Sequence, residues 1–139
     1  MRRLDRDRRG AAALEFALVS MILLLSSFAL IEAGLLLWTR NALNIAAAQT
    51  ARCVAVGAPV CGDPQQYAVG IAANWTQVTM VKAADVTVQI NSTCNAAAGM
   101  FAQVTISSQY WVTVFPPPFA SMTMAAVACF PMNPANPFS

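Results

Sequence analysis

The most prominent pattern in the sequence is a long apolar run near its start. From Ala11 to Trp38 the residues are apolar except for two glutamates and three serines. This run is longer than the roughly 20 residues that a helix needs to cross a bilayer. Arginines precede the run and favour an N-terminus that stays in the cytoplasm. Trp38 suits the interface on the outer side of the membrane. The pattern predicts a transmembrane helix over residues 11–38, with the following residues outside the cytoplasm.

A secretory signal peptide is the alternative interpretation of this run. Its apolar region is longer than that of a signal peptide, and no small-x-small cleavage site follows it closely. The three alanines 46–48 lie too far downstream. These features favour a retained anchor.

Beyond the apolar run, the pattern becomes that of a helix with one buried face. No Pro or Gly occurs from Thr39 to Val56, and Gly57 with Pro59 then supplies a stop signal. A helix from Ala11 to Val56 would be on the order of 70 Å long. Helical spacing places apolar positions on one side, at Leu43, Ala47, Thr50 and Val54, and more polar positions on another, at Asn41, Asn44, Ala48 and Arg52.

The C-terminal half predicts a short helix and a small sheet. Asp63 before a proline is typical of a helix N-cap, so we expect a helix over Pro64–Trp75. Alternating runs predict two half-buried strands, the first around residues 86–90 and the second around 103–114, and residues 121–129 can return as a third. In the third run we expect Met122 and Met124 to be core residues. Apolar positions in the first two runs are Val86, Val88, Ile90, Val104, Ile106, Tyr110, Val112 and Val114.

These elements predict an α+β fold, with a long N-terminal helix and a small antiparallel sheet packed on its outer half. The expected organisation is a basic leader over residues 1–10, the membrane helix over 11–38, an outer domain over 39–130 and an irregular tail over 131–139. A proline triplet at residues 116–118 separates the second and third strands.

Charge is concentrated at one end of the chain. Residues 1–9 hold five arginines and two aspartates, a net charge of +3, whereas the residues after Gly10 carry three basic and four acidic groups, a net charge of −1. Nucleic-acid binding needs Lys and Arg spread over a folded face, so this distribution argues against a nucleic-acid partner.

The cysteines are best interpreted as two disulfides. There is no Cys-x-x-Cys pair and no histidine, so we expect no metal site and no cofactor. Spacing alone leaves three connectivities open. We favour Cys53–Cys61, because Gly57 and Pro59 can turn the chain back, and Cys94–Cys129, because each residue follows or ends a predicted strand; other pairings remain possible while the strand order is unknown.

The residues around Gly10 carry the clearest chemical signal. A basic leader ends in Gly10, the apolar helix begins at Ala11, and a carboxylate follows at Glu15. A cut after Gly10 would leave a free amine on Ala11, and glycine offers a protease an unhindered backbone. Glu15 lies one turn from that amine and suits the positive end of the helix dipole. Alternatively, Gly10 is only a flexible joint and Glu15 only reaches the headgroups.

A second set of helix positions suggests contact with another helix. Small residues form a strip that could pack a neighbouring helix or could be ordinary membrane filler. Glu32 lies close enough to Trp38 to reach the interface, and it is 17 positions from Glu15, about 260° around the helix, so the two carboxylates are not a catalytic pair. The possible helix–helix contacts are Ser26, Ala29, Glu32 and Ala33.

The residues from Arg8 to Val56 resemble the TadE-like family of minor pilins from tight-adherence (Flp-type) type IV pili. The resemblance rests on Arg9-Gly10-Ala11-Ala12-Ala13-Leu14-Glu15-Phe16-Ala17, Ile31-Glu32-Ala33-Gly34, Leu37-Trp38-Thr39-Arg40-Asn41-Ala42-Leu43 and Ala51-Arg52. Ala33 stands where the family often has Phe. Beyond Val56 the likeness is limited to a strand-rich tail ending in Thr123-Met124-Ala125-Ala126.

The resemblance implies a pilin-like subunit of the bacterial inner membrane, with its C-terminal domain periplasmic or extracellular. A prepilin peptidase would remove residues 1–10, and the mature protein would join or prime a pilus that serves adhesion and biofilm formation. The implied partners are the peptidase, other pilins, the assembly platform and the membrane. The rival is an unprocessed, membrane-anchored periplasmic binding module. An enzyme is not expected, since few acids and no histidine base are available.

Overall fold

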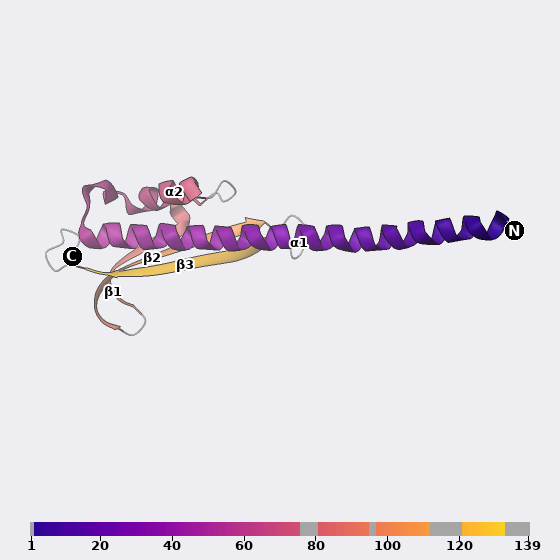
Figure 1. The fold of residues 1–139 in the computed structure, drawn as a ribbon. Helices are drawn as coiled ribbons and strands as arrows, with labels where there is room; N and C mark the ends of the chain where they lie inside the picture. The colour runs from indigo at the N-terminus through magenta and orange to yellow at the C-terminus, as the bar shows by residue number, and fades with distance from the viewer. Residues whose placement is uncertain (1, 76–80, 95–96, 112–120, 133–139) are drawn as a thin grey trace. The chain divides into compact units, whose positions relative to one another are not determined.

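The computed structural model describes residues 2–75, 81–94, 97–111 and 121–132 (Figure 1). The chain divides into two compact units, Met1–Leu35 and Leu36–Ser139. Helix α1 spans Arg2–Val56 and contributes residues to both units. A long helix and an antiparallel sheet are present, which confirms the predicted α+β class.

The first unit consists of the N-terminal part of α1. The helix begins at Arg2, not at Ala11 as the sequence analysis expects. Arginine favours helices and a single glycine costs only about 1 kcal/mol relative to alanine, so Gly10 does not interrupt the helix. From Gly10 onward α1 is long and apolar enough to cross a membrane by length and composition, and the side chains of its most apolar window are exposed.

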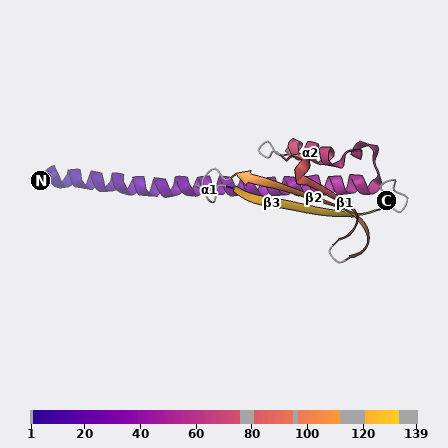
Figure 2. The ribbon, with the colours of Figure 1, turned by 180° about the vertical axis from the view of Figure 1, so that it is seen from behind.

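In the second unit α1 is buried on a wider arc than the sequence predicts. The predicted inner positions, from Leu43 to Val54, are buried and the predicted polar positions are exposed, as expected. However, Ala42, Ala51 and Ala55 are also buried, so the covered arc extends roughly 220° around the helix at 100° per residue. Figures 1 and 2 show the reason: helix α2 lies on one side of this part of α1, and β2 and β3 lie on another.

The end of α1 is fixed by backbone geometry. Gly57 adopts a positive φ of 70°. Its N–H donates to the Val54 carbonyl at 3.1 Å, and the Ala58 N–H donates to the Cys53 carbonyl at 3.2 Å. These two bonds form a Schellman motif, in which glycine accepts the left-handed conformation at little cost. The predicted stop at Gly57 is therefore confirmed.

Helix α2, Pro64–Trp75, follows the predicted bounds. The Asp63 carboxylate accepts hydrogen bonds from the backbone N–H groups of Gln65 and Gln66, each at 3.1 Å. Asp63 is therefore the N-cap that the sequence predicts. A short 3₁₀ turn, η1 (Pro59–Cys61), precedes this helix, and a second one, η2 (Ala83–Asp85), leads into the sheet.

The described strands form one antiparallel sheet in the order β1-β2-β3. They are β1 (Val86–Cys94), β2 (Ala97–Trp111) and β3 (Ser121–Pro131). Val104, Ile106 and Tyr110 are buried, which confirms the predicted alternation in β2. Residues Val112 and Val114 and the proline triplet lie outside the described residues, as does most of the expected tail.

Two predicted positions differ from the structure. Ile90 is 41% exposed although its alternation with Val86 places it on the buried side. The pairing of β1 with β2 shifts register between Gln89 and Ser92, so strict alternation fails there. Met122 was expected in the core with Met124; Met124 is buried, but Met122 is 44% exposed near the start of β3.

Candidate assembly site on the N-terminal helix

Gly10 and Ala11 lie on an exposed helical segment. A Cβ added to Gly10 would meet no heavy atom within 4 Å outside the helix's own turn. Both residues are within α1, whereas proteases generally bind extended backbone. Cleavage after Gly10 would therefore require local unwinding, and glycine lowers the cost of that step.

Glu15 is exposed on the same helix, one turn beyond Ala11. Four residues of α-helix place it about 6 Å further along the axis than Ala11. Glu32 is half-buried. It lies 17 residues further along the same regular helix, about 260° around the axis from Glu15, and therefore on a different face. Glu15 and Glu32 are therefore not placed as a pair on one face of the helix.

The predicted small-residue strip is exposed along α1. Ser26, Ala29 and Ala33 are all exposed to solvent. The Ser26 hydroxyl donates to the Leu23 carbonyl at 2.9 Å, so it is already satisfied within its own helix. This arrangement leaves a smooth, small-residue surface on which another helix can approach closely.

The other serines of the apolar run are satisfied in the same way. Ser20 donates to the Ala17 carbonyl at 3.0 Å, and Ser27 donates to the Leu23 carbonyl at 2.7 Å. A hydroxyl transferred to hydrocarbon without a partner costs several kcal/mol, and these bonds remove much of that penalty. These hydrogen bonds were not predicted from the sequence, although serine within an apolar helix is their signal.

The four cysteines form two disulfides in the second unit. Cys53 at the end of α1 is bonded to Cys61 in η1, with a Cα–Cα distance of 6.1 Å. Cys94 at the end of β1 is bonded to Cys129 in β3, with a Cα–Cα distance of 6.3 Å. The first bridge holds the turn after α1, and the second ties the two outer strands of the sheet together. Both link the cysteines that the sequence analysis pairs.

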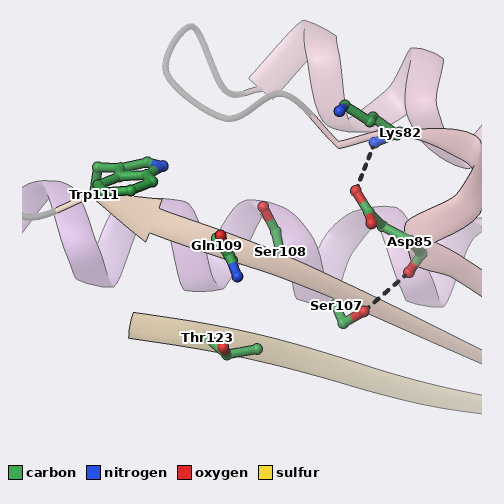
Figure 3. Close-up of a pocket in the computed structure, with 7 residues that line it drawn as sticks. All are labelled: Lys82, Asp85, Ser107, Ser108, Gln109, Trp111 and Thr123. Atoms are coloured by element: carbon green, nitrogen blue, oxygen red, sulfur yellow. Dashed lines mark hydrogen bonds between the residues drawn. The ribbon is translucent and has the colours of Figure 1, made fainter. Parts of the chain in front are cut away.

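A pocket of about 450 Å³, lined mostly by polar residues, lies beside the end of β2 (Figure 3). Its lining is Lys82, Asp85, Ser107, Ser108, Gln109, Trp111 and Thr123. The Asp85 carboxylate accepts the Lys82 backbone N–H at 3.0 Å, and the Asp85 carbonyl accepts the Ser107 hydroxyl at 3.4 Å. Sequence reasoning did not identify this pocket, because η2 and β2 are brought together only by the fold. Among the described residues, no cluster of His, Cys, Asp or Glu could hold a metal ion.

Comparison with protein families finds a match within helix α1. Residues 10–52 match the family model of TadE-like protein, a structural and non-enzymatic family associated with tight-adherence pili. The comparisons with curated proteins and with solved structures return no match. The matched segment begins at Gly10 and covers Glu15, Glu32 and the small-residue strip. Over this part of the N-terminal helix, the chain is therefore similar to TadE-like protein, in agreement with the resemblance found in its sequence.

Proposed function

We propose that this chain is a minor pilin of a tight-adherence pilus, made as a membrane-anchored precursor and cut by a prepilin peptidase between Gly10 and Ala11. The basic leader stays in the cytoplasm, α1 crosses the inner membrane, and the second unit lies outside. After cleavage the protein joins or primes a pilus that contributes to surface attachment. Its partners are the peptidase, other pilins and the assembly platform.

The observation that carries this proposal is the order of features along one helix. A run of arginines, Gly10, an apolar segment and Glu15 follow one another without a break in α1. The TadE-like match starts at Gly10, the residue after which we place the cut. An unprocessed anchor would need the arginines and the apolar segment, but it would have no use for the glycine or the early carboxylate.

Glu15 has a specific role in this proposal. A charged group within a bilayer costs roughly 2.5–3.5 kcal/mol on insertion scales, so a carboxylate there favours a partner. The amine that cleavage creates on Ala11 of a neighbouring subunit has the opposite charge. Pairing the two groups between subunits would couple assembly to prior cleavage.

Pilus yield in Glu15 variants tests this role. We expect Glu15→Ala and Glu15→Gln to insert into the membrane normally and to lose pilus assembly, because neither can pair with an amine as a charge. Ser20→Ala is a matched control, since the Ser20 hydroxyl donates to the Ala17 carbonyl of its own helix. Normal pili in the Glu15→Gln strain would show that charge pairing at this position is not required.

A further inference from the structure

All three tryptophans of the chain are exposed in the second unit. Trp38 is 58% exposed, Trp75 45% and Trp111 66%. A single exposed apolar residue needs no explanation, but tryptophan is costly to leave in water and three together are informative. They come from three different elements: α1, the end of α2 and the end of β2.

Trp38 and Trp75 are direct neighbours. The Trp38 indole N–H donates to the Trp75 carbonyl at 3.0 Å, which ties α1 to the last residue of α2. The indole N–H of Trp38 is thus satisfied while most of its ring stays open. Because the second unit begins at Leu36, both residues lie at the end where the chain enters that unit.

Trp111 is carried to the same end by β2. Ala102 shares a buried cluster with Val54 near the end of α1, whereas Tyr110 is buried in the other cluster with Leu43. From Ala102 to Trp111 a strand extends on the order of 30 Å, and from Val54 back to Trp38 the helix spans about 24 Å. Trp111 therefore reaches the level of Trp38. Figures 1 and 2 agree, because the β2 arrowhead points back along this part of α1.

We infer that Trp38, Trp75 and Trp111 form a rim that rests in the phospholipid headgroup layer on the outer face of the membrane. Tryptophan is enriched at this depth, where its ring meets both apolar and polar groups. The rim lies where the chain passes from the apolar helix into the second unit. This inference rests on the proposed membrane anchoring.

The rim would limit how the second unit sits before assembly. One interfacial tryptophan on a helix leaves a domain free to tilt, whereas three from separate elements define a plane. The anchored subunit would then be held close to the bilayer until extraction into a pilus removes the rim from lipid.

Depth-dependent quenching of tryptophan fluorescence tests the inference. The full chain with Trp38→Phe and Trp75→Phe keeps only Trp111 and is reconstituted into phosphatidylcholine vesicles with lipids brominated near the headgroup or deep in the chain. We expect Trp111 to lose fluorescence, and to lose more with the shallow label. The control chain carries all three Trp→Phe changes and Val60→Trp, which places an indole on a 67% exposed residue near the opposite end of the unit, just after α1. That indole should not be quenched.

Resistance of the reconstituted chain to alkaline extraction reports anchoring separately. If the chain is anchored and Trp111 is not quenched, or is quenched no more than the tryptophan at position 60, the rim does not contact lipid and the inference is wrong while the proposed function stands. A blue-shifted but unquenched Trp111 in the anchored chain would instead place it against protein, and would also overturn the inference. A chain that extracts freely would contradict the proposed anchoring itself.

Discussion

Gly10 could aid cleavage in two ways, by easing local unwinding of the helix or by fitting the peptidase cleft without a side chain. Replacing Gly10 with alanine tests the first. Gly10 lies within α1, and an added Cβ would meet nothing within 4 Å, so Gly10→Ala should preserve the helix without a clash. Alanine stabilises a helix by about 1 kcal/mol relative to glycine. If the peptidase requires an unwound segment, that difference lowers the population of the open site, and hence the cleavage rate, by a factor of about 5.

Leucine has nearly the same helix propensity as alanine, so Gly10→Leu should cost the same amount in unwinding. Any further loss would then measure crowding in the peptidase cleft, and we expect Gly10→Leu to block cleavage. The assay is the rate of conversion from precursor to mature protein in membranes that contain the peptidase. Gly34→Ala is the matched control, because Gly34 is also open in α1 but lies far from the cut. Cleavage of Gly10→Ala at the unchanged rate would refute the unwinding step.

Other predictions concern the second unit and are measured by thermal or denaturant unfolding of the full chain in detergent. Leu43→Ala should destabilise the unit by about 2–5 kcal/mol because Leu43 is fully buried, whereas Met122→Ala, on an exposed side chain, should change stability by no more than about 0.5 kcal/mol; equal effects would contradict the core assignment. Removing the Cys94–Cys129 bridge should cost about 3.8 kcal/mol and removing Cys53–Cys61 about 2.5 kcal/mol, because the loops closed span 35 and 8 residues. Non-reducing peptide mapping checks the pairing, and a Cys53–Cys129 or Cys61–Cys94 peptide would refute it.

The features that the sequence predicts well depend on local chemistry. The end of α1 at Gly57 and the N-cap at Asp63 are each set by one residue and its immediate neighbours, and both occur as expected. Helical spacing likewise places Leu43 and Val54 on the buried side. The residues of the candidate assembly site also follow one another along a single helix, and their roles stay predictions.

The features that the sequence does not predict depend on how elements meet. The buried arc of α1 is wide because α2 covers a second side, and no pattern within α1 reveals how many elements pack on it. Ile90 is exposed because the ladder between β1 and β2 shifts register, which alternation along one strand cannot show. The common level of Trp38 and Trp111 follows from the length of β2 and its direction along the helix.

The N-terminal mass of the protein extracted from membranes tests the central claim most directly. Cells that contain the prepilin peptidase should yield a mature chain that begins at Ala11, while cells without it should yield a chain that retains the arginine-rich leader. A chain that retains residues 1–10 in the presence of the peptidase would contradict the processed-pilin account, and would favour an unprocessed, membrane-anchored module.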